Sequence, residues 1–273
     1  MAGRTDAKDG TPHDIVSPYR VIGKPLVKVD AAAKCTGQTK FADDIILPRM
    51  LFAKILRSTV PHARILSIDT SKVEKFPGVK AVLLGRDLPT RYGIMPVSED
   101  EQVLATDKVR MVGDPVAAVC ATDEDVATEA LDLFDVRYQP LPTIASIQGA
   151  LDVSDPRIHE YGEYGNVHRR IAYEFGNVQE GFAEADFVRE DIAFYEGSTH
   201  LPLEQHASVA QFGYDGKLTL WTSTQNPHYL HRTIAKVLGI PASRIRVIAT
   251  PCGGGFGGSA IRSTTRFSSA SFR

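Results

Sequence analysis

The sequence of 273 residues is poor in cysteine and has no long apolar run. Its three cysteines, Cys35, Cys120 and Cys252, lie far apart, so they predict neither a disulfide framework nor a Cys-x-x-Cys metal or redox pair. No stretch approaches the ~18 consecutive apolar residues that a membrane span needs, and residues 1–14 lack the apolar core of a secretory signal. The hydrophobic fraction of 43% is ordinary for a globular protein. These features predict a soluble, cytoplasmic protein without a membrane partner.

Acidic residues are missing from the last part of the chain. Asp215 is the final acid, and residues 216–273 carry eight Lys and Arg, although the whole chain has a net charge of −2. Such a segment suits nucleic acid, a phosphorylated cofactor or an acidic partner surface, and ordinary charge fluctuation is the remaining explanation. The basic residues are not interleaved with aromatic ones as in single-strand binders, so no nucleic-acid partner is expected.

Short apolar runs between turn residues predict an α+β domain over residues 19–145. The expected strands cover residues 50–57, 65–69, 79–84, 115–121 and 136–139. Thr122, with Asp125 three residues later, predicts the start of a helix whose apolar face continues to Phe134. The polar residues 1–18 are predicted to form a flexible leader, and residues 146–176, rich in charge, Gly and Tyr, a linker.

A second region is expected over residues 177–258. Residues 186–195 and 207–214 are strand-like, and Asp215-Gly216 predicts a hairpin turn. Asn226-Pro227 predicts a helix start and Gly239 its end. A further strand over residues 244–250 leads into a glycine-rich run. Residues 259–273 hold five Ser, two Thr and three Arg, and are predicted to be disordered because they can bury little apolar surface.

The glycine-rich run, Cys252-Gly-Gly-Gly-Phe-Gly-Gly258, is the most distinctive motif. It matches Gly-x-Gly-x-x-Gly formally, but a dinucleotide site also needs a following helix and an acid about 20 residues downstream, and no acid follows here. So many glycines indicate close approach of the backbone to a ligand such as a phosphate, or a tight turn without a ligand.

Direct binding of a metal by side chains is not expected. His200, Glu204 and His206 are near one another in sequence, as are His228 and His231, but neither group has the spacing of a zinc site. A Gly-x-Ser-x-Gly nucleophile motif is also missing from the sequence.

Two blocks of sequence resemble the molybdenum hydroxylases, the xanthine dehydrogenase/aldehyde oxidase family. Residues 41–69, followed by Pro-Gly-Val-Lys-Ala-Val-Leu and Val-Gly-Asp-Pro-Val-Ala-Ala-Val-Cys-Ala, resemble the α/β hammerhead domain of their large subunits. Residues 199–210 and 221–258 resemble the start of their molybdopterin-binding region. The resemblance implies an α+β chain in which the hammerhead domain precedes a truncated molybdopterin-binding domain.

The resemblance also implies roles for individual residues. Gln225 would hydrogen-bond an oxo ligand of molybdenum, and the backbone of Gly254, Gly255 and Phe256 would run beside the metal and the pterin dithiolene. His200 and Glu204 would lie near the site on the substrate side. The implied cofactor is molybdenum-molybdopterin in its cytosine dinucleotide form, with iron–sulfur clusters and FAD on partner subunits.

The family's catalytic glutamate, in a Gly-x-Gly-Glu segment, has no counterpart here, so no catalytic residue is assigned. Ser259 stands where the family has Lys, and the composition of residues 259–273 suggests a frameshift or truncation. We therefore expect this chain alone to be inactive. Within the family, the sequence of both blocks most resembles that of 4-hydroxybenzoyl-CoA reductase, which removes the para-hydroxyl group of an aromatic CoA thioester. The alternatives are a hydroxylase subunit of the xanthine dehydrogenase type and a non-catalytic hammerhead interaction module.

Overall fold

The computed structural model describes residues 19–93, 99–153, 155–160, 165–199 and 201–257. The predicted leader (1–18) and predicted disordered tail (259–273) lie outside these residues. The chain divides into two compact units, residues 1–39 and 40–273. The described part of the first unit contains the short helix α1 (Ala31–Cys35), whose Lys34 forms an ion pair with Asp30.

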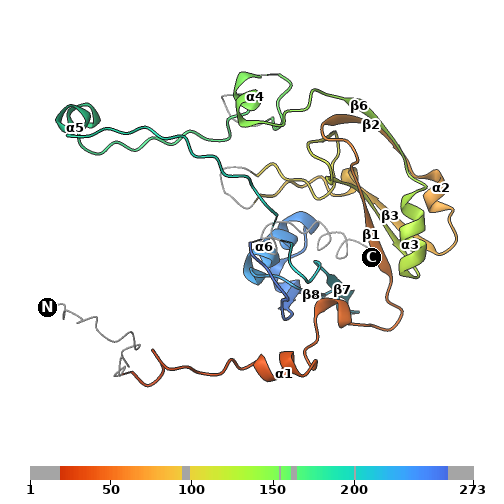
Figure 1. The fold of residues 1–273 in the computed structure, drawn as a ribbon. Helices are drawn as coiled ribbons and strands as arrows, with labels where there is room; N and C mark the ends of the chain where they lie inside the picture. The colour runs from red at the N-terminus through yellow and green to blue at the C-terminus, as the bar shows by residue number, and fades with distance from the viewer. Residues whose placement is uncertain (1–18, 94–98, 154, 161–164, 200, 258–273) are drawn as a thin grey trace. The chain divides into compact units, whose positions relative to one another are not determined.

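The second unit begins with two three-stranded antiparallel sheets (Figure 1). One has the order β1 (Phe52–Arg57), β5 (Pro115–Ala121), β3 (Val79–Leu84), and the other the order β4 (Lys108–Val109), β2 (Ala63–Asp69), β6 (Asp135–Pro140). Strand β5 is buried from Val116 onward because both faces of its sheet are covered, which explains its nearly continuous apolar sequence. Val119 packs with Ala130, whereas its neighbour Ala118 packs with Leu104 in another core. The short elements η1 (Ala42–Asp44), α2 (Ser71–Glu74) and η2 (Gly85–Asp87) lie in the connections.

Helix α3 (Glu124–Leu131) follows β5 and packs against the first sheet. Its buried residues are Ala127 and Ala130. The predicted cap, Thr122, is wrong by one residue, because the Asp123 side chain accepts the hydrogen bond from the Val126 backbone N–H at 2.9 Å. A carboxylate is a strong N-cap acceptor and also interacts favourably with the positive end of the helix dipole.

The third sheet, in the later part of the second unit, has the order β7 (Ser208–Phe212), β8 (Leu218–Thr222), β9 (Ile245–Ala249). Strands β7 and β8 form the predicted hairpin, whereas β8 and β9 are parallel and are connected through helix α6 (Pro227–Leu238) and η3 (Ala242–Arg244). Parallel neighbours need such a crossover, and α6 buries Leu230, Ile234 and Val237. Gly239 ends the helix in the left-handed conformation, at φ 63°.

A shared hydrophobic core joins these two parts of the second unit. It includes Leu104 and Ala118 from the first part together with Leu220 and Ile234 from the second. The Tyr229 hydroxyl donates to the Gly93 carbonyl oxygen at 2.7 Å, which adds a polar contact between them.

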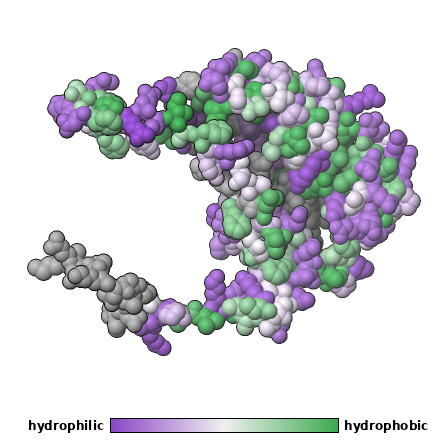
Figure 2. Space-filling view, viewed as in Figure 1, coloured by the Kyte–Doolittle hydropathy of each residue, from purple (hydrophilic) through white to green (hydrophobic). Residues whose placement is uncertain are grey.

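The segment between these parts contains α4 (Ile147–Asp152), and α5 (Val178–Glu184) follows it. The strand predicted over residues 186–195 is wrong, because these residues have no strand assignment and form no ladder with another described segment. An alternating sequence becomes a strand only where a neighbour can pair with its backbone. Apolar side chains of the residues around α5, including Phe175, Ile192 and Phe194, are exposed, as Figure 2 shows for the segment on the left.

Among the described residues, no helix has both the length and the apolar character needed to cross a membrane.

Candidate functional site

The glycine-rich loop lies at the end of β9, beside the segment that follows β8. Parallel strands have their carboxyl ends at the same edge of a sheet, and Thr222 at the end of β8 is paired in register with Ala249 at the end of β9. The segment leading to Gln225 and the loop over residues 252–257 therefore start from neighbouring positions. This topology explains why residues about thirty positions apart meet.

Gln225 forms one wall of the loop. Its Oε1 accepts a hydrogen bond from the Gly257 backbone N–H at 3.2 Å. A Cβ atom on Gly255 would lie 2.4 Å from Gln225 Cδ, so the side chain occupies the space that any larger residue at position 255 would need. The Gln225 side chain is exposed, and its Nε2 has no hydrogen-bond acceptor among the described residues.

Glu204 and Pro202 form the opposite wall. Glu204 Oε2 accepts a hydrogen bond from the Gly253 backbone N–H. A Cβ on Gly253 would lie 2.8 Å from Glu204 Cβ, and one on Gly254 would lie 3.1 Å from Pro202 Cβ. Both glycines therefore allow a close approach that a side chain would prevent.

The backbone of the loop adopts conformations that favour glycine. Gly254 has φ 144° and Gly257 has φ 84°. Phe256 has φ 44°, in the left-handed region that costs a residue with a Cβ about 1 kcal/mol or more, and its side chain is 74% exposed. Cys252 Sγ donates to the Gly254 carbonyl oxygen at 3.3 Å, which is a hydrogen bond within the turn itself.

The structure brings Gln225, Gly254, Gly255, Phe256 and Glu204 together around one loop. His200 lies outside the described residues. In the described part of the chain, no group of three His, Cys, Asp or Glu residues is arranged to hold a metal ion. The exposed groups at the loop are instead the Gln225 carboxamide and glycine backbone, which fit an anionic cofactor that carries its own metal ligands. The Glu204 carboxylate is turned toward the Gly253 N–H, and its Oε1 is buried.

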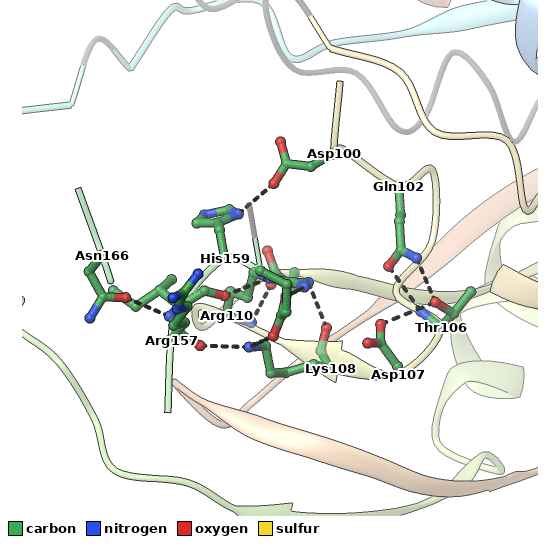
Figure 3. A network of polar contacts seen from close by, with 12 residues as sticks. Asp100, Gln102, Thr106, Asp107, Lys108, Arg110, Arg157, His159 and Asn166 are labelled. Carbon is green, nitrogen blue, oxygen red and sulfur yellow. Dashed lines mark hydrogen bonds and ion pairs between the residues drawn. The ribbon is translucent and has the colours of Figure 1, made fainter. Parts of the chain in front are cut away.

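A second polar cluster, not predicted from the sequence, connects β4 to residues 157–160 and to Asn166 (Figure 3). Lys108 is 2% exposed, forms an ion pair with Glu160 and donates to the Arg157 carbonyl oxygen at 2.7 Å. Arg110 donates to Glu160 at 2.8 Å. Desolvation raises the pKa of Glu160, but the hydrogen bonds and charges of Lys108 and Arg110 outweigh it and lower the pKa to about 2.

The same cluster extends to the ends of the segment. His159 Nδ1 lies 2.7 Å from an Asp100 carboxylate oxygen, and the Asn166 side chain bonds to the Ile158 N–H and the Val153 carbonyl oxygen. The part of residues 146–176 that contains this cluster is thus bonded to the sheet that contains β4. Its only signal in the sequence is the placement of two basic residues, Lys108 and Arg110, two positions apart at the short strand β4.

A cavity of about 590 Å³ lies elsewhere, lined by β1, η1 and β7. None of the predicted site residues lines it. The glycine-rich loop and its walls therefore remain the candidate site.

Comparison with protein families gives two matches. Residues 36–142 match the aldehyde oxidase and xanthine dehydrogenase a/b hammerhead domain, and residues 158–270 match the molybdopterin cofactor-binding domain. The second match includes the glycine-rich loop with both of its walls. The two matches confirm the predicted α+β fold and the predicted order of its domains.

Individual relatives agree with these matches. The nicotinate dehydrogenase large molybdopterin subunit of Eubacterium barkeri is 43% identical over 242 residues, which are 88% of this chain and 56% of the relative. A probable xanthine dehydrogenase from Bacillus subtilis (strain 168) is 39% identical over 241 residues, or 87% of this chain and 32% of the relative.

Among solved structures, quinoline 2-oxidoreductase from Pseudomonas putida 86 is similar with a TM-score of 0.80 at 30% identity. The similarity covers 90% of this chain and 32% of that one. The Cu,Mo-CO dehydrogenase has a TM-score of 0.77 at 34% identity, with 89% and 33% covered. The chain thus spans about half the length of one of these proteins and about a third of the others.

Proposed function

Because this chain belongs to the xanthine dehydrogenase and aldehyde oxidase family of molybdenum hydroxylases, we propose that its glycine-rich loop and Gln225 form part of the molybdopterin site of an oxidoreductase. The observation that carries the proposal is the packing of the Gln225 carboxamide into the space that a Cβ on Gly255 would fill. That contact places an amide donor directly beside the glycine backbone. When bound, the molybdenum cofactor supplies the two-electron redox change of the reaction.

The residues of this chain bind and orient the cofactor. The Gln225 amide nitrogen would be free to donate a hydrogen bond to an oxygen of the cofactor, while its Oε1 accepts from the Gly257 N–H. Gly254 and Gly255 would present only backbone to the pterin dithiolene, and their lack of a Cβ lets Pro202 and Gln225 pack against the loop. Phe256, exposed and held at positive φ, would be available to contact the bound group.

For the substrate, we propose a nitrogen-containing aromatic ring. Three of the relatives are named for nicotinate, xanthine and quinoline, which share this chemistry. In the proposed reaction a ring C–H and one water become C–OH, and two protons and two electrons are released. The electrons leave through iron–sulfur clusters and FAD on partner subunits, and the cofactor is the cytosine dinucleotide form. These assignments, like the cytoplasmic location, are part of the proposal.

The prediction of 4-hydroxybenzoyl-CoA reductase finds no support in the named relatives. It differs from the proposal in direction, since the aromatic C–OH would become C–H with two electrons consumed. One assay of the direction of electron flow therefore distinguishes ring hydroxylation from reductive removal of the hydroxyl group.

The test uses the chain co-expressed with iron–sulfur and FAD subunits and with a further polypeptide that supplies the family's Gly-x-Gly-Glu segment, because this sequence has no counterpart of it. Nicotinate and quinoline are supplied with an electron-accepting dye, and 4-hydroxybenzoyl-CoA with a low-potential donor. The proposal predicts dye reduction with a ring substrate, at a rate about a hundredfold lower in Gln225→Ala. Gln211→Ala, which removes an exposed glutamine on β7, is the matched control and should keep the rate. Turnover of the thioester alone, or an unchanged rate in Gln225→Ala, would contradict the proposal.

A further inference from the structure

Each end of the glycine-rich loop is bonded to one side chain from outside the loop. Gly257 N–H donates to Gln225, which follows β8, and Gly253 N–H donates to Glu204, which precedes β7. Three consecutive glycines have no side chains with which to pack and have the greatest backbone freedom of any residue type. The orientation of their peptide groups therefore depends on external contacts of this kind.

Glu204 packs closely against the loop. Its Cβ occupies the space beside Gly253, at 2.8 Å from the position of a Cβ there, and Pro202 in the same segment lies against Gly254. Oε2 accepts from the backbone, while Oε1 is buried and has no hydrogen-bond partner among the described residues. Burying a carboxylate oxygen without a partner costs free energy, so a specific reason is expected for placing the group there.

We propose that Glu204 is a positioning residue that fixes the Cys252–Gly253 peptide, so that the backbone of residues 254–256 faces the cofactor. The inference rests on the proposed function and changes the role expected for Glu204 from the substrate side to the loop. A carboxylate accepting from a backbone N–H gives a charge-assisted hydrogen bond, about twice as strong as a neutral one. Glu204 thus does for the start of the loop what Gln225 does for its end.

The test observes the Gly253 amide directly. Cys252–Gly253 is the sole Cys–Gly dipeptide of the sequence, so labelling cysteine with ¹³C at the carbonyl and glycine with ¹⁵N gives one unambiguous NMR signal. Hydrogen exchange of this amide needs no bound cofactor. The variants are Glu204→Ala and Glu204→Gln, and the control is Glu196→Ala, which removes an exposed carboxylate from the same segment.

The proposal predicts exchange about tenfold or more faster in Glu204→Ala, since hydrogen bonds to charged groups have about this strength. Glu204→Gln should lie between Glu204→Ala and the original chain, because the amide oxygen still accepts. Glu196→Ala should match the original chain. If Glu204→Ala does not fold, Glu204→Gln decides: faster exchange supports the proposal, and unchanged exchange overturns it.

A second readout separates this inference from the proposed function. The pterin retained by each chain after gel filtration, purified with its partner subunits, is oxidised to a fluorescent product and quantified. Reduced retention in Glu204→Ala with partial recovery in Glu204→Gln supports the positioning role. Equal retention in all chains overturns it. If the original chain retains no pterin, the proposed function fails, whereas the Gly253 exchange rates still decide whether Glu204 holds the loop.

Discussion

Replacing Gly255 with alanine tests the contact between the loop and Gln225. The new Cβ would lie 2.4 Å from Gln225 Cδ, 2.7 Å from Oε1 and 2.8 Å from Nε2. All three atoms belong to the end of a flexible, exposed side chain, so the glutamine moves away and the backbone does not have to. The variant should therefore remain folded but lose the carboxamide from its place beside the loop.

The expected effect of Gly255→Ala follows from the contacts that the Gln225 carboxamide loses. Moving the carboxamide breaks the hydrogen bond from Gly257, which contributes about 1 kcal/mol to the free energy of unfolding. Removing a preorganised donor from the proposed cofactor site should cost far more in function, about a hundredfold in turnover. Gly255→Ala should thus lower the unfolding free energy by only about 1 kcal/mol while nearly abolishing activity and pterin retention.

Urea denaturation followed by the fluorescence of Trp221 measures the first quantity, and the pterin assay with dye reduction measures the second. Gly181→Ala is the matched control, because a Cβ there meets nothing within 4 Å and should affect neither cofactor nor turnover. If Gly255→Ala retains pterin and turnover like the control, the contact between Gln225 and the loop does not shape the cofactor site.

Three further predictions concern stability. The pKa of Glu160, at about 2, is below its usual value of 4.5, so this carboxylate stabilises the folded chain above about pH 4.5, and the contribution is lost as the pH falls toward 2. Glu160→Gln should flatten that part of the acid denaturation profile, and an unchanged profile would refute this. At neutral pH the substitution should also lower the unfolding free energy by about 2 kcal/mol, because buried Lys108 loses its charged partner. Ile234→Ala, in the buried face of α6, should lower the unfolding free energy by about 3 kcal/mol in urea denaturation, and a loss below about 1 kcal/mol would mean that α6 does not pack as described. Asp123→Ala should cost about 1 kcal/mol by removing the cap of α3, whereas Thr122→Ala should not remove it.

Much of the fold could be predicted from local sequence. The strand expected over Pro115–Ala121 is β5, and the helix expected to start at Pro227 and end before Gly239 is α6. In both cases the pattern of apolar residues and the boundary residues agree, and the structure supplies neighbours that bury the apolar face. The strand expected over residues 186–195 failed because its pattern is local, whereas a ladder needs a partner.

The glycine-rich loop of the candidate site could be predicted from the sequence, whereas the long-range contacts of its carboxylate could not. Glycines after a strand indicate close backbone approach, and a parallel partner explains why Gln225 lies beside them. The bond from Gly253 to Glu204 joins residues 49 positions apart, and the pair of Lys108 with Glu160 joins residues 52 apart. No local pattern encodes such pairs, because either carboxylate could equally well face solvent.

The most direct test of the account is the molar ratio of molybdopterin to this chain, measured after purification with its partner subunits. The account predicts a ratio near one for the original chain and a large reduction in Gln225→Ala. A chain that folds and binds its partners but contains no pterin would contradict it, and would favour the non-catalytic interaction module instead.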